Sequence, residues 1–323
     1  MSPAAPPGAP VLSLGEALVE FMPEPAGQSM RGALNWRKYA GGGPATYAAA
    51  VVRCGRPAAL ITRLGDDAFS DFLVDALAEE GVDVSRIIRV PGRQAGICFH
   101  ECIEGRTTLA FQRRHSAATT LGPEDIDPAA IAGAAALHVP GTTLQISDGA
   151  LEASLAAIAA ARDAGVPVSF DPNVRALPGA AGTAAAFEEA VAAADVVTPT
   201  LEEAAAITGC EDPVEAGREL LARGPRLAVV TLAAEGCVVL AEGEEPVRCP
   251  GYPVPVVEPT GAGDCHAAAT TVGFLEGWGP ERIGAFANAA GAIAVTAMGH
   301  FGPALPTPAR MAELMGTNPE GTP

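Results

Sequence analysis

The sequence predicts an α/β fold built on a mostly parallel central sheet, and three observations support this expectation. The 323 residues are 49% hydrophobic and only 18% charged, so the chain is long and apolar enough to bury a sizeable core. From residue 135 onward, short apolar runs alternate with Ala-rich helical segments, which is typical of parallel strands joined by helices. No internal repeat and no break in composition marks a second globular domain.

The N-terminal third is expected to begin this alternation after a flexible leader. Residues 1–10 are rich in Pro and Ala and lack the basic and apolar regions of a signal peptide. Apolar runs, a glycine turn followed by Pro44, and a helix stop at Gly81 then predict strands and helices in turn. The strands are expected at 11–14 and 58–63, and the helices at 44–54 and 70–80.

Two segments interrupt the alternation. Residues 20–39 contain two prolines and no sustained periodicity, so this segment is expected to be extended or irregular and to lie outside the core. Residues 96–101 and 107–112 are expected to form a β-hairpin. The two pieces could pair as a lid.

The remaining elements follow from regular alternation. Strands are expected at 135–139, 166–170, 195–198 and 227–231, and helices at 148–164, 182–193, 201–208 and 213–223. An antiparallel hairpin is expected at 237–240 and 247–249. Two Ala-rich helices, at 262–276 and 280–298, complete the expected order.

Charge and motif content exclude several classes of function. Twenty Lys plus Arg against 38 Asp plus Glu give a net charge of −18, so neither nucleic acid nor an anionic membrane is expected as a partner. Lys38 is the single lysine, which removes the P-loop. The sequence also lacks the Gly-x-Ser-x-Gly elbow of serine hydrolases and a Gly-x-Gly-x-x-Gly dinucleotide motif after the first strand.

Cysteine and histidine spacing indicate a cytoplasmic protein and do not favour a zinc enzyme. The seven cysteines form no Cys-x-x-Cys pair, which suits a reducing compartment, and they are interpreted as small buried apolar residues. The five histidines show no ligand spacing such as His-Glu-x-x-His, so a zinc enzyme is not expected. No stretch approaches the roughly 20 apolar residues of a membrane span.

The strongest local feature is a glycine turn that leads into an Ala-rich helix, with the sequence Pro259-Thr260-Gly261-Ala262-Gly263-Asp264. Its glycines allow a turn with free amides, and the helix start adds partial positive charge, so the turn is a candidate anion site. Asp264 falls in the first helical turn, where a carboxylate could simply stabilise the helix. A carboxylate beside anion-binding amides also suits phosphoryl transfer, with Asp264 as the base.

This turn resembles the C-terminal signature of the ribokinase-like (PfkB) carbohydrate kinases, with Glu258 in place of the usual first Asp. Residues 41–48 resemble the family's Gly-Gly-x-Pro-Ala-Asn-x-Ala signature, except that Thr46 replaces the Asn. Further similar segments occur in the expected order at 64–69, 171–175, 230–232 and Gly236. The resemblance runs from about residue 11 to 310.

The resemblance implies a ribokinase-like fold, in which a Rossmann-like, mostly parallel sheet carries helices on both faces and a small β-lid is added. It implies a single kinase domain over residues 11–310, with lid insertions at about 17–39 and 94–114 and a tail at 311–323. The sugar would lie between the lid and the sheet. Because lid edges of relatives often pair between subunits, a homodimer through the lid is expected by analogy.

The resemblance also implies the catalytic and nucleotide-binding residues. Asp264 would be the base, and the amides of Gly261, Ala262 and Gly263 would hold the transferring phosphate. ATP and Mg²⁺ are implied, and a monovalent cation such as K⁺ would bind near residues 258–264. Nucleotide contacts are expected from Thr200, Glu203, Thr231, Gly236, Gly261, Gly263 and Asn288, with Glu203 holding the metal through water. Thr200 replaces the Asn of the family's Asn-x-x-Glu motif, and this pair could also be a helix capping box.

The substrate is expected to be a sugar acid. The implied substrate-binding residues are Glu20, Gly42, Gly43, Thr46, Phe111, Arg113, Arg175 and Asp264. Arg113 lies in a stretch similar to that of 2-keto-3-deoxygluconate kinases, and Arg175 matches the arginine of their Asp-Pro-Asn-x-Arg segment. Arginine pairs in a bidentate manner with carboxylates, which favours a sugar acid.

Two alternatives stay open. A fructokinase or another neutral-sugar or nucleoside kinase is the first, because Phe111, Gln112, His115 and Thr46 depart from the stretches they are compared with. A non-catalytic member that binds a sugar is the second, and the intact Asp264 turn argues against it.

Overall fold

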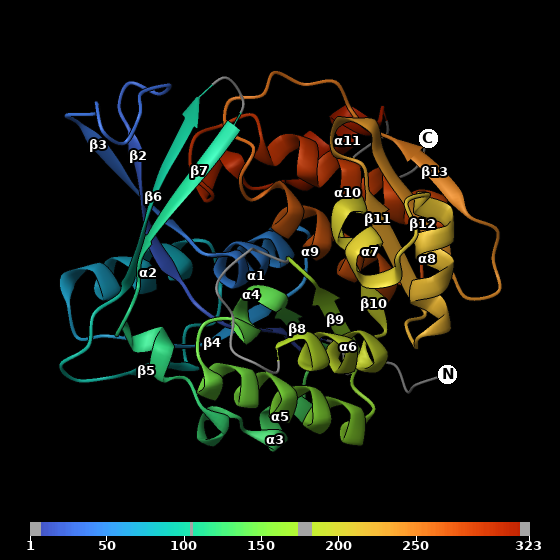
Figure 1. Ribbon diagram of the computed structural model, residues 1–323, viewed down its shortest axis with the longest axis horizontal. Helices are drawn as coiled ribbons and strands as arrows, with labels where there is room; N and C mark the ends of the chain where they lie inside the picture. The colour runs from blue at the N-terminus through green and yellow to red at the C-terminus, as the bar shows by residue number, and fades with distance from the viewer. Residues whose placement is uncertain (1–7, 104–105, 174–182, 317–323) are drawn as a thin grey trace.

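The computed structural model describes residues 8–103, 106–173 and 183–316, and a large sheet lies at its centre (Figure 1). The strand order of this sheet is β13-β12-β11-β10-β9-β8-β1-β4-β5. The strands are β1 (Val11–Leu14), β4 (Ala58–Leu64), β5 (Ile87–Arg89), β8 (Ala136–Pro140), β9 (Val168–Asp171), β10 (Val196–Val197), β11 (Leu227–Thr231), β12 (Gly236–Ala241) and β13 (Val247–Pro250). Pairing is parallel from β5 to β11, and β12 and β13 add an antiparallel edge. The predicted mostly parallel sheet is confirmed.

Helices cover both faces of this sheet because successive strand residues point to opposite sides. In β1, Val11 packs into one apolar core while Leu12 packs into another. The first core includes residues of α1 (Gly43–Arg53), α2 (Ala68–Glu79), α9 (Ala262–Leu275) and α10 (Pro280–Ala294). The second includes residues of α5 (Asp148–Ala164), α6 (Thr183–Ala193), α7 (Leu201–Thr208) and α8 (Pro213–Ala222). The predicted arrangement, with helices on both faces of the sheet, is therefore confirmed.

A second, four-stranded sheet stands to one side of the large sheet (Figure 1). Its order is β3-β2-β6-β7, with β2 (Leu18–Pro23), β3 (Trp36–Gly41), β6 (Gly96–Ile103) and β7 (Arg106–Gln112). Strand β2 pairs in parallel with β6, and the other pairings are antiparallel. Only Gly15, Glu16 and Ala17 separate β1 from β2, so β1 of the large sheet runs almost directly into the small one. We call this small sheet the lid.

The expectation that residues 20–39 lie outside the core is wrong for the first residues of the segment, where Glu20, Met22 and Pro23 are buried, and holds for its last residues, 36–39, which are exposed or half-buried. Its first part belongs to β2, which is buried, and its last part belongs to β3. Phe21 of β2 packs against the same core as α1. The prolines misled the prediction because Pro23 lies at the end of β2, where a missing N–H is tolerated.

Other boundaries differ only locally from the sequence prediction. Helix α10 ends at Ala294, four residues before the expected 298, because the carbonyl of Val295 accepts hydrogen bonds from the amides of Val257 and Glu258. Strand β5 and three short helices were not predicted: α3 (Pro128–Ala132), α4 (Gly141–Leu144) and α11 (Pro308–Met315). Short 3-10 turns lie at Ala117–Thr120, Pro123–Asp125, Ala233–Glu235 and Gly302–Ala304.

The cysteines are free and only partly fit the expectation of burial. Cys98, Cys237, Cys249 and Cys265 are buried, whereas Cys54, Cys102 and Cys210 are partly exposed. Among the described residues, no helix combines the length and the apolar character needed to cross a bilayer.

Candidate active site

A pocket lies where the order of the parallel strands reverses. The chain passes from β1 to β4 and β5 on one side, and then returns to β8 on the other side of β1. Ligand sites of open α/β sheets form beyond the carboxyl ends of the strands at such a point. Glu16, which follows β1, and Thr142, which follows β8, line the pocket together with residues of lid strands β6 and β7.

The structure brings together most of the predicted substrate-binding residues. They come from the lid, from the start of α1 and from the start of α9. Those that line the pocket are Glu20, Gly42, Gly43, Thr46, Phe111, Arg113 and Asp264. Arg175 lies outside the described residues.

The turn at 259–264 forms the start of α9. Its N-cap, Gly261, has φ 87°, a left-handed conformation that favours glycine. No side chain in the described part of the chain caps α9, so its first amides are available to an anion. The carboxylate of the buried Glu258 accepts hydrogen bonds from the amide and hydroxyl of Thr260, at 3.1 and 2.7 Å, and thereby holds the turn.

Glycines at the start of α1 let three segments approach one another. A Cβ on Gly43 would lie 2.9 Å from Oδ1 of Asp264, so the missing side chain gives this carboxylate its place in the pocket. Gly42 has φ 97°, and its amide donates a hydrogen bond to Oε1 of Glu20 at 3.1 Å. Thr46 is buried one turn further along α1.

Arg113 is already paired within the pocket. Its guanidinium forms an ion pair with Glu16, and both side chains are largely buried. The guanidinium carbon also lies 4.5 Å from the centre of the Phe111 ring. A substrate carboxylate would therefore share Arg113 with Glu16. Glu16 was not among the predicted site residues, although an acidic residue directly after the first strand of a parallel sheet is a recognisable signal.

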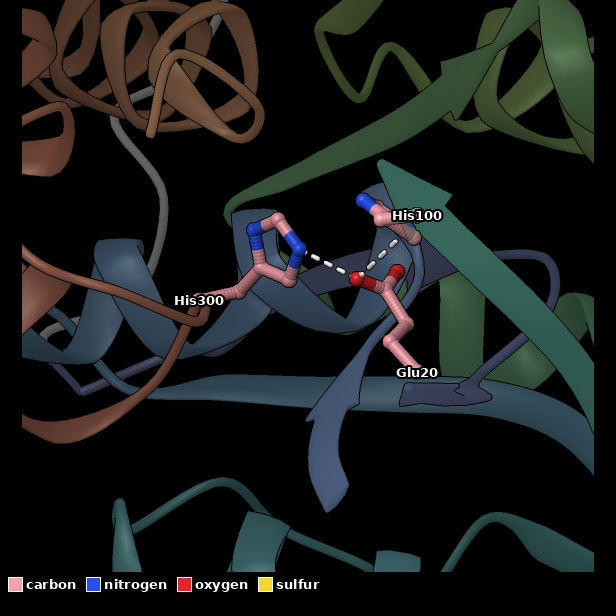
Figure 2. A group of neighbouring side chains, drawn as sticks. All are labelled: Glu20, His100 and His300. Atoms are coloured by element: carbon pink, nitrogen blue, oxygen red, sulfur yellow. Dashed lines mark ion pairs between the residues drawn. The ribbon is translucent and has the colours of Figure 1, made fainter. Parts of the chain in front are cut away.

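A buried cluster of Glu20, His100 and His300 forms the lid side of the pocket (Figure 2). Nε2 of His100 lies 3.1 Å from Oε2 of Glu20, and His300 forms an ion pair with the same oxygen. Burial disfavours the charged carboxylate, but both imidazoles outweigh this and hold the pKa of Glu20 well below its usual range. Burial also disfavours the charge on His300, but Glu20 outweighs it and raises the pKa of His300 to about 9.

Sequence spacing could not reveal this cluster. Its members lie on β2, on β6 and after α10, and only the fold brings them together. The lack of a local ligand spacing therefore carries no information on His100 and His300, which the fold brings together with Glu20.

The predicted nucleotide-binding residues lie near the ends of neighbouring strands, outside the pocket lining. Thr200 caps α7 and forms a capping box with Glu203, with distances of 2.9 and 3.2 Å. Thr231 ends β11 and forms a bridge with Thr200. Gly236, with φ 100°, begins β12. These residues therefore occupy the same carboxyl edge of the sheet as the pocket.

Asn288, the last of the predicted nucleotide-binding residues, is hydrogen-bonded to the backbone. Its side chain is buried, and its Nδ2 donates hydrogen bonds to the carbonyls of Cys249 and Pro250 at 3.0 and 3.1 Å. Asn288 thereby joins α10 to the end of β13.

This arrangement suits chemistry on a hydroxyl group. Asp264 could accept a proton from a hydroxyl bound in the pocket, and the amides at the start of α9 could hold an anion beside it.

Comparison with known proteins also indicates chemistry on a hydroxyl group. A family model described as pfkB family carbohydrate kinase matches residues 9–308.

Individual relatives agree with the family match. The chain is 33% identical to a 2-dehydro-3-deoxygluconokinase of Thermoproteus tenax over 313 residues, which are 94% of each chain. It is also 33% identical to a probable fructokinase-5 of Arabidopsis thaliana, over 94% of this chain and 97% of the relative. A solved protein described as a putative Ribokinase II from E. coli, in complex with ATP and Mg²⁺, superposes with a TM-score of 0.83 at 29% identity, over 90% and 94% of the two chains. The chain thus belongs to the pfkB family of carbohydrate kinases.

Proposed function

We propose that the protein transfers the γ-phosphoryl group of ATP to a hydroxyl of a sugar acid of the 2-keto-3-deoxygluconate class. The observation that carries this proposal is the position of Asp264. Its carboxylate lines the lid-covered pocket and lies in the first turn of α9, whose N-terminus has no side-chain cap in the described residues. A base and an anion site are thus adjacent, as transfer to a hydroxyl requires.

In the proposed step, Asp264 accepts the proton of the substrate hydroxyl while the hydroxyl oxygen attacks the γ-phosphorus. The new O–P bond forms as the bond from the γ-phosphorus to the bridging oxygen breaks, and ADP leaves with that oxygen. Amides of residues 261–263 hold the transferring oxygens, since an uncapped helix N-terminus favours anions. The lid excludes water, to which the phosphoryl group would otherwise be lost.

The described residues also suit Mg²⁺ with ATP. The capping box fixes the Glu203 carboxylate at the start of α7, and carboxylate oxygens are ligands that Mg²⁺ prefers. Glu203 would hold the ion through water, and Thr200, Thr231, Gly236 and Asn288 would border the nucleotide. When bound, Mg²⁺ neutralises charge on the phosphates.

The proposed substrate class depends on two arginines. Arg113 lines the pocket and Arg175 would complete the carboxylate site by resemblance. A relative named as a 2-dehydro-3-deoxygluconokinase supports this class. The Glu16–Arg113 pair, however, favours a second candidate, because it compensates the charge of Arg113 and leaves a polar pocket suited to a neutral sugar such as fructose. A relative named as a probable fructokinase supports that candidate.

A screen of ADP release separates these candidates. The purified protein is tested with ATP and Mg²⁺ against sugar acids, neutral sugars and nucleosides. The proposal expects a sugar acid to give the highest kcat/KM. If fructose or a nucleoside exceeds every acid, the carboxylate assignment is wrong; if no compound stimulates ADP release, the protein is a non-catalytic family member.

Two further features of the family are proposed for this chain. A monovalent cation such as K⁺ would bind beside the 258–264 turn, where Glu258 replaces the usual Asp. A homodimer would form through the lid, whose outer strands β3 and β7 have one unpaired edge each within the described residues. Sedimentation at working concentration tests the dimer, and a monomeric profile would remove it.

A further inference from the structure

We propose that Glu20, His100 and His300 form a binding site for a divalent cation of the Zn²⁺ class on the lid side of the pocket. Each residue offers one ligand atom, and the three atoms lie within 4.8 Å of one another. Figure 2 shows both imidazoles directed toward one carboxylate oxygen of Glu20. Small side-chain rotations would let one ion reach all three at the bond lengths of about 2.0–2.2 Å found for zinc.

The set of ligands selects the kind of ion. Two imidazoles and one carboxylate are the protein ligands of a common class of zinc sites, which keep a further position open. Imidazole nitrogen suits Zn²⁺, Co²⁺ and Ni²⁺, whereas Mg²⁺ prefers oxygen. The site would therefore be distinct from the Mg²⁺ that accompanies ATP.

The three ionisable side chains of the cluster are all buried, which is unusual for such groups. Glu20 is 4% exposed, and His100 and His300 are each 3% exposed. Within the described residues, neither ring nitrogen of either histidine forms a regular hydrogen bond. Their Nε2 atoms instead approach the same oxygen, Oε2 of Glu20, as ion pairs. Buried polar groups without regular partners call for an explanation, and a cation at their meeting point provides one.

The surrounding backbone leaves room for the cluster and orients it. A Cβ on Gly41 would lie 2.5 Å from the carboxyl carbon of Glu20, and a Cβ on Gly261 would lie 2.7 Å from Nδ1 of His300. The other carboxylate oxygen of Glu20 accepts a hydrogen bond from the amide of Gly42 at 3.1 Å. Glu20 is thus held by one oxygen and presents the second to both imidazoles.

All three residues line the pocket, so the remaining coordination positions would face it and be filled by water or by substrate oxygens. Entering metal would displace the proton that His300 carries beside Glu20, as occurs whenever an imidazolium becomes a ligand. Binding of the ion itself needs neither ATP nor a sugar, so the test is independent of the proposed kinase reaction.

Isothermal titration of ZnCl₂ into the full-length protein, without nucleotide or sugar, tests the site. One ion per chain should bind with a Kd of about 10 μM or tighter. His100→Gln and His300→Gln should each weaken binding by about 100-fold. The matched control is His115→Gln, which alters an exposed histidine outside the cluster and should leave the affinity unchanged. Circular dichroism of each variant checks that it is folded.

The absorption spectrum of the wild-type protein with Co²⁺ gives a second result that needs no variant. Imidazole and carboxylate ligands should produce weak visible bands without thiolate-to-metal charge transfer. Charge-transfer bands would place the ion on cysteine and overturn the proposal. Absence of Zn²⁺ binding below millimolar concentration would also overturn it and leave the cluster as an ion-paired support for Glu20.

Discussion

Replacing Asp264 by Asn removes the proposed proton acceptor while keeping the size and shape of the side chain. The amide has nearly the same shape as the carboxylate, so it should fit beside Gly43, where a Cβ would come within 2.9 Å of Oδ1. Loss of general-base assistance should reduce turnover by about 10²–10⁴. This range corresponds to about 2.7–5.5 kcal/mol in activation free energy.

The same change should have a much smaller effect on stability. A carboxylate in the first turn of a helix contributes about 0.3–1 kcal/mol through the helix dipole. The matched control is Asp148→Asn, which removes an exposed carboxylate from the first turn of α5, away from the pocket. It should cost similar stability and leave turnover intact.

Turnover would be followed by coupled ADP release, KM by varying the sugar, and stability by thermal unfolding. An Asp264→Asn variant that keeps more than half of wild-type turnover would refute the role of Asp264 as base. A loss of turnover that follows a comparable loss of folded protein would show that the residue acts on the fold instead.

Further predictions concern specificity, backbone, pH and ions. Arg113→Ala should raise the KM of a sugar acid more than about tenfold, since a charge-assisted hydrogen bond is worth about 1.5–3 kcal/mol, and should change that of fructose little; equal changes would contradict carboxylate binding. Gly261→Ala should reduce turnover because φ is 87° and the new Cβ would lie 2.7 Å from His300. The control is Gly279→Ala, before α10 and outside the pocket lining, where φ is −71° and the nearest atom to a new Cβ would lie 3.8 Å away; it should retain activity. Partial burial raises the pKa of Asp67, but hydrogen bonds from Ser70, Ala95 and Phe69 outweigh this effect and lower that pKa. The ionised Asp67 should therefore stabilise the fold above about pH 4, and this stabilisation should fade as the pH falls. The difference in melting temperature between wild type and Asp67→Asn should shrink on acidification, and a constant difference would contradict this. The rate of phosphoryl transfer should be higher in a potassium buffer than in a buffer with a bulky organic cation. Equal rates would contradict the proposed monovalent-cation site.

The parts of the fold that could be predicted from the sequence are those that repeat a local rule. Helices α5 and α7 and strand β11 occupy the predicted ranges, because apolar periodicity, caps and glycine stops act over a few residues. Asp264 could be found for the same reason, since its signal lies in six consecutive residues. The lid strand β2 could not, because its burial comes from cross-strand partners far along the chain.

The charged lining of the pocket shows the same limit more strongly. Glu16 meets Arg113 and Glu20 meets His300 only after β1, the lid and the segment after α10 have come together. No local pattern encodes such pairs, so sequence motifs identified the pocket but missed Glu16 and both histidines.

The short connection between β1 and β2 restricts how the lid can move relative to the large sheet. Gly15, Glu16 and Ala17 are the entire span between β1, which is paired on both sides in the large sheet, and the inner lid strand β2. Gly15 is tightly enclosed, because a Cβ there would lie 2.1 Å from Oγ1 of Thr143 and 2.6 Å from Cγ of Pro44. The connection about which the lid would tilt is thus fixed by close packing, and Glu16 and Glu20 lie close to it. A tilt that moves the outer lid strands β3 and β7 far from the large sheet would therefore displace these two carboxylates only slightly.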